Sequence, residues 1–326
     1  MKLDQVKWGI IGCGAVTEVK SGPAFQKVEN SELVAVMRRN GALAKDYAER
    51  HHVPKWYDDA DALLNDPEVN AVYIATPPGS HKEYALKAAA AGKAVYVEKP
   101  MAVNFTECEE MIAACKTAGV PLYVAYYRRA QSRFLKVKEL LDNNAIGDVR
   151  FVNTSQYRKV SNEVKSGKEL PWRLQPALSG GGLFFDLASH TLDMLDFLLG
   201  PIKDVQGIAS NQAGYYKAED IVTGTYQFVS GVHGVGSWCF SAFENVDINE
   251  IIGSEGKITF STFGDDPIVL ITAQGQQEWS FKRPEHVQQP LITSIVAELT
   301  GKGGTSPSTG ANGARTNWVL DALAKQ

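Results

Sequence analysis

The sequence predicts an α/β protein of two domains, a doubly wound parallel sheet followed by an α+β domain with an open, mostly antiparallel sheet. In residues 1–125, short continuous apolar runs alternate with helical patterns, which is typical of parallel strands joined by crossover helices. Beyond Ile146-Gly147, longer β-branched and aromatic runs follow one another with only short turns between them. The length of 326 residues also favours two domains, at about 150 residues each. We expect them to cover residues 1–125 and 126–326.

Five strands are expected in the first domain, because five apolar runs are continuous and would be covered on both faces of a sheet. They are Val6–Ile11, Leu33–Met37, Ala71–Ala75, Ala94–Val97 and Leu122–Ala125. The helices between them carry boundary signals. Ser80 precedes a helix that Gly92 ends, and Asn104 with Glu107 forms a capping signal for a helix that ends at Gly119.

Five longer strands are expected in the second domain, where the runs are separated by short turns. They are Phe151–Tyr157, Ile221–Val229, Val232–Phe240, Asp247–Ile252 and Lys257–Phe263. A strong helix is expected over Phe184–Leu199 and ends at Gly200. The tail, about residues 311–325, is again helical, with apolar residues around Trp318 and Leu320.

Composition and charge exclude several classes of function. The net charge is −4 and no basic stripe is present, so a nucleic-acid partner is not expected. No apolar run reaches about 18 residues, which argues against a membrane span. The N-terminus lacks the basic stretch and longer apolar core of a signal peptide. The four cysteines form no Cys-x-x-Cys pair, so no metal site is expected and a cytoplasmic location fits.

The first strand leads into a glycine-containing turn, Gly12-Cys13-Gly14, at the point where a βαβ unit would begin its helix. Such a turn brings N–H groups close to a pyrophosphate, and the positive end of the helix adds to the attraction. The candidate cofactor-binding residues here are Gly12, Gly14, Ala15 and Val16; an ordinary glycine turn is the alternative. The third position of the dinucleotide fingerprint is Thr17 instead of Gly or Ala. Because Ser21-Gly22-Pro23 follows, the helix should be short or broken there.

The end of the second strand indicates the choice of cofactor. An NAD site usually offers an acid to the ribose 2′-hydroxyl about 20 residues after the glycines. This chain has Arg38-Arg39 instead, and two cations suit a 2′-phosphate. We therefore expect NADP(H) to be favoured over NAD(H), with a solvated basic turn as the alternative.

Two further motifs follow strands at the carboxyl edge of the sheet, where ligands bind in such folds. Thr76 and Pro77 follow the third strand, and His81 begins the next helix rather than acting as a catalyst. In Glu98-Lys99-Pro100 the two charged side chains point to opposite sides, so Lys99 would face the cofactor crevice. Lys99 could then pass a proton to or from a carbinol oxygen, although a surface lysine is the alternative. We count Thr76, Pro77, His81, Glu98 and Lys99 among the candidate cofactor-binding residues.

The long helix of the second domain carries Asp186 and His190, four residues apart on an otherwise apolar helix. Burying a polar pair on an apolar helix costs free energy, so we expect the pair to serve a purpose. That purpose is either catalysis or a buried His–Asp hydrogen bond that serves only the fold. The preceding Gly180-Gly181-Gly182 lets backbone or substrate approach closely. Asp193 and Asp196 are expected to face solvent or to cap the helix.

Taken in order, these motifs resemble the glucose–fructose oxidoreductase / inositol dehydrogenase / MocA (Gfo/Idh/MocA) family over nearly the whole chain. The resemblance implies a Rossmann domain followed by an α/β domain on an open, mostly antiparallel sheet. It also implies that Lys99, Asp186 and His190 handle the proton of the reaction. Trp172-Arg173 is similar to the pair that borders the substrate pocket in sugar-reducing members, and Tyr127 and Arg128 should also face the pocket. The last helix is expected to pack back on the first domain.

These features predict an NAD(P)-dependent oxidoreductase that transfers a hydride between nicotinamide and a sugar, polyol or related carbonyl or hydroxyl compound. Two alternatives stay open: a glycoside-cleaving enzyme that uses tightly bound NAD transiently, and a cofactor-binding sensor without chemistry. The sequence does not name the substrate, because loops such as Tyr157–Leu170 shape the pocket and follow no readable template. An open apolar sheet face predicts a homodimer or homotetramer.

Overall fold

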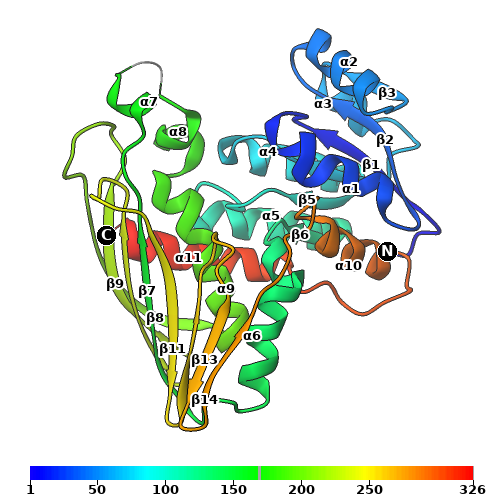
Figure 1. Ribbon diagram of the computed structural model, residues 1–326. Coiled ribbons are helices and arrows are strands. Elements are labelled where there is room, and N and C mark those ends of the chain that lie inside the picture. Colours follow the sequence, from blue (N-terminus) through cyan, green and yellow to red (C-terminus); the bar gives the residue numbers. More distant parts are fainter. Residues whose placement is uncertain (168–169, 326) are drawn as a thin grey trace. The chain divides into compact units, whose positions relative to one another are not determined.

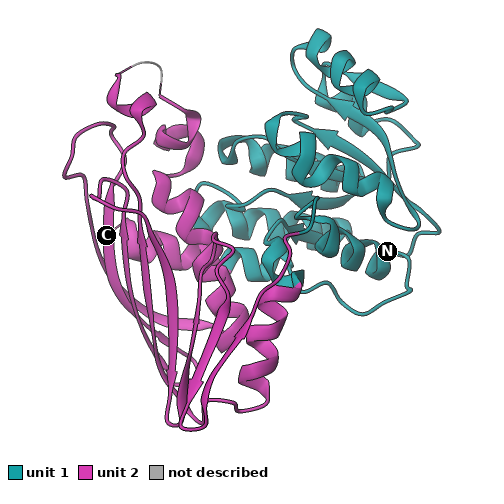
Figure 2. Cartoon of the chain, in the orientation of Figure 1, with its two compact units in different colours: residues 1–131, 284–314 teal, residues 132–283, 315–326 magenta. Residues whose placement is uncertain are grey.

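The structure is a computed structural model that describes residues 1–167 and 170–325. Part of the loop Tyr157–Leu170 therefore lies outside the described residues. The chain divides into two compact units (Figure 2). The first contains residues 1–131 and 284–314, and the second contains residues 132–283 and 315–326.

A six-stranded parallel sheet forms the centre of the first unit (Figure 1). Its order, β3-β2-β1-β4-β5-β6, changes direction at β1, which is the crevice where ligands bind in doubly wound folds. The strands are β1 (Val6–Ile11), β2 (Ser31–Met37), β3 (Lys55–Tyr57), β4 (Ala71–Ile74), β5 (Ala94–Val97) and β6 (Leu122–Val124).

Helices cover both faces of this sheet, because neighbouring residues of each strand contribute to different cores. Trp8, Tyr73 and Tyr96 pack against α1, α2 and α10, whereas Val72 and Val95 pack against α3, α4 and α5. The bounds are α1 (Gly22–Lys27), α2 (Gly41–Arg50), α3 (Ala60–Leu64), α4 (His81–Ala90), α5 (Phe105–Ala118) and α10 (Gln289–Leu299). Three short elements complete the unit: a π-helix over Thr17–Ser21 and 3₁₀ turns over Pro78–Ser80 and Tyr127–Ala130.

An eight-stranded sheet, in the order β14-β13-β12-β11-β7-β10-β9-β8, forms the second unit. Neighbouring strands are antiparallel except β7 and β10, which are parallel. The bounds are β7 (Val149–Tyr157), β8 (Ile202–Ser210), β9 (Ile221–Phe228), β10 (His233–Cys239), β11 (Val246–Gly253), β12 (Gly256–Phe260), β13 (Ile268–Thr272) and β14 (Gly275–Trp279). Together with the parallel first sheet, this arrangement confirms the expected fold class.

Helices cover one face of the eight-stranded sheet, where α6, α9 and the later part of α11 share a core with the inward-facing side chains. The helical bounds in this unit are α6 (Ser132–Asp142), α7 (Asn162–Lys165), a 3₁₀ turn (Trp172–Leu174), α8 (Pro176–Ser179), a π-helical turn (Phe184–Ala188), α9 (Ser189–Leu199) and α11 (Gly310–Ala324). The opposite face exposes apolar side chains such as Ile208, which is 75% exposed, and Val235. This face remains open among the residues described.

The structure differs from the sequence-based expectations in several elements. Strands β3, β8, β13 and β14 and helices α6 and α10 were not expected. β3 has only three residues, β14 is rich in polar residues, and short apolar runs such as β13 do not distinguish strand from helix. The first unit extends to Gln131 rather than residue 125 and takes in residues 284–314 from much later in the chain.

The last helix also differs from expectation. Only its first residues, 310–314, belong to the first unit, where Gly313 lies against Val124 and Met101. From Arg315 onward the helix belongs to the second unit, and Leu320 is part of the second unit's core. Apolar spacing identifies a buried face of a helix without telling which sheet it packs on.

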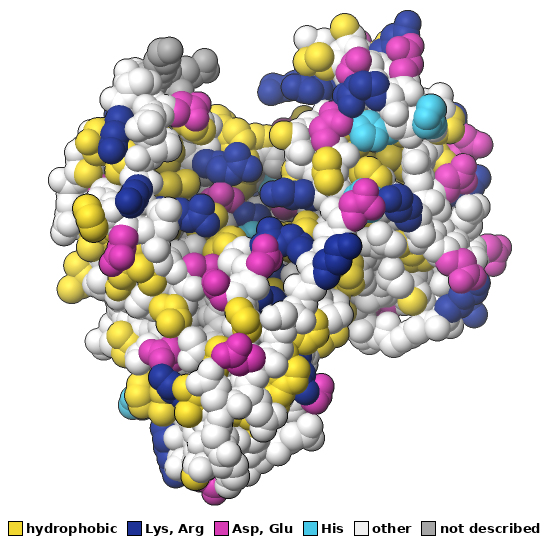
Figure 3. Space-filling model, in the orientation of Figure 1, with side chains coloured by type: hydrophobic (Ala, Val, Ile, Leu, Met, Phe, Trp, Pro, Cys, Tyr) yellow, Lys and Arg dark blue, Asp and Glu magenta, His cyan; other side chains and the backbone are white. Residues whose placement is uncertain are grey.

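Surface charge is mixed in sign. Figure 3 shows both basic and acidic side chains spread over the face of the molecule in view. Within the described part of the chain, no helix is both long and apolar enough to cross a membrane.

Candidate functional site

The glycine turn after β1 has the geometry of a dinucleotide turn. Gly12 has a φ of +93°, and a Cβ there would come within 3.0 Å of the Thr76 main-chain nitrogen, so the position requires glycine. A Cβ on Gly14 would meet only the Gly12 carbonyl oxygen, at 3.8 Å, which leaves open space beside this residue. Ala15 and Val16 begin the helix, whose first N–H groups lack intrahelical acceptors. These residues fit a pyrophosphate.

The Thr17 side chain closes this turn through two hydrogen bonds to Gly14. Its Oγ1 accepts a hydrogen bond from the Gly14 N–H at 3.0 Å and donates to the Gly14 carbonyl at 2.8 Å. The Thr17 carbonyl in turn accepts the Tyr47 hydroxyl at 2.9 Å. The helix was expected to be short or broken at Ser21-Gly22-Pro23, and it changes type there: it runs as a π-helix until Ser21 and continues as α1 from Gly22. Thr17 is therefore compatible with the turn despite its departure from the fingerprint.

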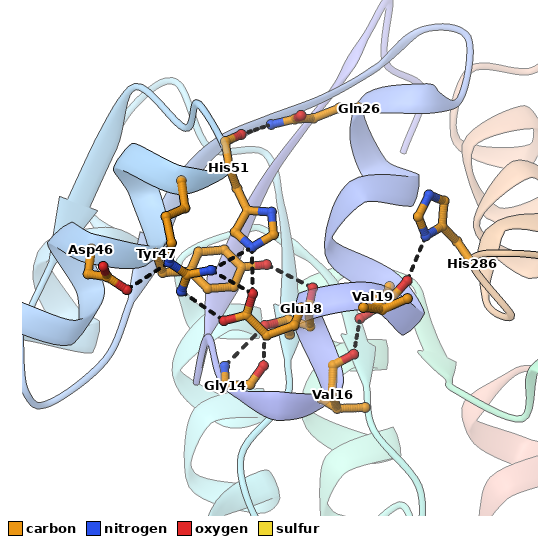
Figure 4. Close-up of polar contacts among 12 residues, drawn as sticks. Gly14, Val16, Glu18, Val19, Gln26, Asp46, Tyr47, His51 and His286 are labelled. Atoms are coloured by element: carbon orange, nitrogen blue, oxygen red, sulfur yellow. Dashed lines mark hydrogen bonds and ion pairs between the residues drawn. The ribbon is translucent and has the colours of Figure 1, made fainter.

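Glu18, on the outer side of this π-helix, is held by two basic residues: Arg50, the last residue of α2, and His51, which follows it (Figure 4). Arg50 donates to both carboxylate oxygens, at 2.8 and 2.9 Å, and His51 Nε2 lies 2.7 Å from one of them. The hydrogen bond from Arg50 is the largest influence on the pKa of Glu18; burial opposes it, the hydrogen bond from His51 adds to it, and together they lower the pKa to about 2. The ion pair anchors the π-helix to α2.

Arg38 and Arg39 follow β2 with exposed side chains. The charge of Arg38 acts on Cys13, in the middle of the glycine turn: burial raises the pKa of the Cys13 thiol to about 11, and Arg38 opposes that shift. Arg38 therefore lies within electrostatic reach of the turn where the dinucleotide would sit.

His81 and Glu98 lie behind the sheet edge rather than on its surface. His81 is fully buried, with Nε2 2.7 Å from the Thr76 carbonyl and Nδ1 3.1 Å from the Pro100 carbonyl. Its ring thus ties the loop that carries Thr76 and Pro77 to the segment after Lys99. Both ring nitrogens of His81 lie at main-chain carbonyl oxygens of these two loops, so the ring supports them.

The buried Glu98 carboxylate accepts hydrogen bonds from several groups of the first unit. The Tyr73 hydroxyl donates to it at 2.5 Å, Gln288 Nε2 at 2.6 Å, and the main-chain N–H of Lys99 at 3.1 Å. Glu98 therefore faces the core, and the half-buried Lys99 follows it at the carboxyl end of β5. β5 neighbours β4, and β4 neighbours β1, so Lys99, Thr76 and the glycine turn share one edge of the sheet.

In the second unit, Asp186 is paired with a predicted substrate residue. Arg173 Nε lies 3.1 Å from Asp186 Oδ2, and the Arg173 guanidinium lies 4.4 Å from the centre of the Trp172 ring. Asp186 sits in the π-helical turn Phe184–Ala188, and His190 lies in the first turn of α9. The helix is therefore irregular between the two residues, which the sequence pattern does not reveal.

Phe263 is a site residue that the sequence analysis missed. Its ring packs at 83° against the buried His190 ring, with centroids 5.6 Å apart, and the Arg158 guanidinium lies 5.4 Å from the Phe263 centroid. The Asp247 carboxylate holds the loop by accepting the N–H groups of Thr262, Phe263 and Gly264. Asp247 and Phe263 are 16 residues apart, and their spacing matches no motif that would identify a functional site from the sequence.

Other predicted residues have different surroundings. Arg128 is buried, and its guanidinium lies 5.0 Å from the centre of the half-buried Tyr127 ring. The expectation for Asp193 and Asp196 was wrong, because both are buried and face α11. Asp196 accepts two hydrogen bonds from Arg315, at 2.7 and 2.8 Å, and Asp193 lies 3.5 Å from the Thr316 hydroxyl.

Each unit thus gathers its own set of predicted residues. In the first unit, one sheet edge carries the glycine turn, Thr76, and Lys99. In the second, Trp172, Arg173 and Asp186 form one cluster, and His190 begins the helix that follows.

Comparison with known proteins agrees with this architecture. Residues 6–126 match the oxidoreductase family with an NAD-binding Rossmann fold, and residues 134–259 match the GFO/IDH/MocA C-terminal domain. The chain is 40% identical over 322 residues to oxidoreductase P35 of Formosa agariphila, covering 98% of both proteins. It is 27% identical over 318 residues to a 1,5-anhydro-D-fructose reductase of Ensifer adhaerens, covering 94% of this chain and 92% of the reductase.

A solved structure extends the likeness to three dimensions. The aldose-aldose oxidoreductase of Caulobacter crescentus, complexed with glycerol, matches with a TM-score of 0.85 and 26% identity, over 98% of this chain and 96% of that chain. The two family matches, together with a relative that is 40% identical along nearly the whole length, show that this chain belongs to the Gfo/Idh/MocA oxidoreductase family.

Proposed function

We propose that this NAD(P)-dependent oxidoreductase interconverts a hydroxyl and a carbonyl group on a sugar, a polyol or a related compound. The position of Lys99 carries the proposal, because this residue follows β5 on the same sheet edge as the glycine turn and Thr76. That edge is where dinucleotides bind in doubly wound folds. Family membership and the relative that is a 1,5-anhydro-D-fructose reductase support a carbohydrate-like substrate.

A bound nicotinamide would supply the hydride acceptor or donor. The protein's own residues would bind the substrate and move its proton. We propose that Lys99 or His190 exchanges a proton with the substrate oxygen, and that Asp186 orients the group that does so. The Arg173–Asp186 ion pair keeps the Asp186 carboxylate in a defined position. Trp172, Arg173, Tyr127 and Arg128 are proposed to contact the substrate.

The proposal is tested by following the reduced-nicotinamide absorbance while the protein turns over a panel of sugars and polyols. A dehydrogenase or reductase changes this absorbance in proportion to the product formed. Consumption of a glycoside without net absorbance change would indicate transient use of tightly held NAD instead. Cofactor binding without consumption of any compound would indicate a sensor.

We further propose that NADP(H) is the preferred cofactor. Support comes from the exposed side chains of Arg38 and Arg39 and from the influence of the Arg38 charge on the glycine turn. A guanidinium in this place suits a 2′-phosphate. Titration with NADPH and NADH compares the two affinities. Tighter binding of NADH, unchanged in Arg38→Ala, would contradict this proposal.

We also propose that the protein is a homodimer or homotetramer formed through the open face of the eight-stranded sheet. One row of side chains crosses five strands of this face, and all of its members are uncharged: Ile208, Thr223, Ser237, Ser155 and Ile248. Interfaces between copies are depleted of charge at their centres. The cytoplasmic location expected from the sequence stays a prediction.

A further inference from the structure

Segment His286–Gln288, which precedes α10, joins two parts of the first unit that are far apart in the sequence. His286 and Gln288 are buried, although the segment has no regular structure of its own. On one side it meets the π-helix after the glycine turn, and on the other it meets Glu98, the residue before Lys99.

The contact with the π-helix replaces hydrogen bonds that this helix cannot make. Pro23 has no N–H group, so in a regular helix the Val19 carbonyl would lack its donor four residues later. His286 Nδ1 lies 2.6 Å from that carbonyl (Figure 4). The main-chain N–H of Gln288 donates to the next carbonyl, that of Lys20, at 3.1 Å.

The tautomer of His286 follows from its partners. Because Nδ1 faces a carbonyl oxygen, it must donate, and the neutral ring then has an acceptor at Nε2. The Lys27 ammonium lies 2.5 Å from Nε2 and can donate to it. His286 thus holds the π-helix at Val19 and α1 at its last residue.

The side chain of Gln288 makes the contact with Glu98. Its Nε2 donates to Glu98 Oε1 at 2.6 Å, and its Oε1 accepts the Tyr96 hydroxyl at 2.7 Å. Burial and the neighbouring Glu98 charge hold the pKa of Tyr96 well above its usual value, so this hydroxyl stays protonated and donates. The amide can therefore adopt only one orientation, with its NH₂ group on the carboxylate.

Glu98 also holds the backbone of Lys99. Its second oxygen accepts the main-chain N–H of Lys99 at 3.1 Å, so the carboxylate that Gln288 holds also holds the backbone of the lysine. The Tyr73 hydroxyl completes the arrangement by donating to Glu98 Oε1 at 2.5 Å. Hydrogen bonds to a buried carboxylate are strong, and losing one leaves that charge poorly compensated.

We propose that Gln288 is a positioning residue that couples the dinucleotide turn to Lys99. Its main-chain N–H holds the helix that follows the glycine turn, and its side chain holds Glu98 and, through it, Lys99. The expected effect of Gln288 on turnover rests on the proposed function. The expected effect of Gln288 on cofactor binding requires only that the glycine turn binds the dinucleotide.

Two substitutions and one matched control test the proposal. Gln288→Met keeps the volume and removes the hydrogen bonds, and we expect it to weaken NADPH and NADH binding and to lower kcat, each by about tenfold or more. Gln289→Met makes the same chemical change one residue later, where the side chain is only half-buried, and should leave both quantities unchanged. Circular dichroism and thermal unfolding establish that the variants are folded.

Gln288→Glu gives a readout that packing alone would not produce. At low pH the introduced carboxyl is protonated and can donate to Glu98 as the amide does. As the pH rises, two carboxylates would face each other at hydrogen-bond distance, and like charges so close cannot both ionise without cost. The cofactor affinity and kcat of this variant should approach those of the native protein at low pH and fall increasingly below them as the pH rises.

The outcomes separate this proposal from the proposed function. A folded Gln288→Met that binds cofactor and turns over like Gln289→Met would overturn the proposal. A loss in Gln288→Glu that is equal at every pH would also overturn it, because it would show a packing role only. If the native protein turns over no sugar or polyol, the proposed function fails, while cofactor titration of the same variants still decides the role of Gln288.

Discussion

Phe263 packs at 83° against His190, with the ring centroids 5.6 Å apart. In Phe263→Leu, the imidazole would lose this aromatic neighbour, while the loop would still be held by Asp247. We expect kcat to fall about tenfold or more, because a displacement of about 1 Å can cost about 10²-fold in rate. Cofactor affinity should change little. Steady-state kinetics and cofactor titration measure the two effects.

Phe243→Leu is the control for this prediction, because Phe243 is 90% exposed and the chemical change is the same. It should leave kcat near the native value. An equal kcat in both variants would show that His190 does not depend on Phe263.

The lowered pKa of Glu18 predicts that the stability of the protein depends on pH. Glu18 has its pKa lowered in the folded protein, from an ordinary 4.5 to about 2, so its stabilising effect is complete above the ordinary value and is lost as the pH falls toward 2. Glu18→Gln should therefore lower Tm at neutral pH, and the difference from the native protein should shrink as the pH falls below about 4.5. Thermal unfolding at a series of pH values measures this difference.

A suitable control is Glu29→Gln, since the Glu29 side chain is 89% exposed and its nearest cation, the Lys302 ammonium, is 3.8 Å away. Such a pair contributes little to stability. We expect a small Tm change at every pH in this control. If the Tm difference of Glu18→Gln stayed constant across the pH range, the ion pair with Arg50 would not be its source.

Single residues were predictable where they lie in a local motif. Gly12, Thr76 and Lys99 each follow a strand directly, so chain order alone places them on one sheet edge. Phe263 and Gln288 depend instead on contacts between segments more than 70 residues apart. No local pattern encodes such contacts, so neither residue could be recognised from the sequence.

At the level of elements, α9 and α11 are joined by an ion pair between Asp196 and Arg315. The two partners differ in exposure: the Asp196 side chain is 5% exposed and that of Arg315 is 38% exposed. Removing the arginine takes a guanidinium partner away from a buried carboxylate, and breaking a buried ion pair in this way typically costs about 3 kcal/mol. Removing the carboxylate leaves a guanidinium that water can still reach.

We therefore expect Arg315→Met to lower the stability of the protein more than Asp196→Asn does. Thermal and urea unfolding of both variants would establish the order. Equal losses, or a larger loss in Asp196→Asn, would mean that the burial of the carboxylate is not the main contribution.

Elements with a clear apolar period and a terminal signal were predictable, such as β1, β5 and the helix that ends at Gly200. The short edge strands β3 and β14 were not, because neither carries a long apolar run that would mark a buried strand. The two π-helical turns were also missed. They occur at the glycine turn and at Asp186, the points where the helices carry predicted functional residues.

At the level of the whole molecule, the open sheet face predicts association of identical copies. Replacing Ile208, the 75% exposed residue at one end of the uncharged row, by Asp would add a charge to this face, so the oligomer should dissociate toward monomers. Light scattering of the native and variant proteins measures the change in mass. Leu135→Asp, on an exposed part of α6, should leave the mass unchanged. A native protein that is monomeric at micromolar concentration would refute the prediction.

Two domains and their order were predictable from the change in strand pattern near residue 147, but the exact division was not. Residues 284–314 return to the first unit after the whole second sheet. Their helix α10 covers one face of the first sheet and starts at Gln289. A hydrophobic helix at the end of a chain fits either domain by composition, so only three-dimensional contacts decide.

We propose that Lys99, Asp186 and His190 handle the proton of a nicotinamide-dependent reaction. Measurement of kcat and cofactor affinity in Lys99→Met, Asp186→Asn and His190→Ala tests these roles. Lys87→Met is the control, since Lys87 lies on α4 and pairs with surface acids. We expect each of the first three variants to lose about 10²–10⁴ in kcat, the usual contribution of one acid–base group, with a much smaller effect on cofactor affinity. A Lys99→Met variant that turns over substrate as fast as Lys87→Met would show that Lys99 does not transfer the proton.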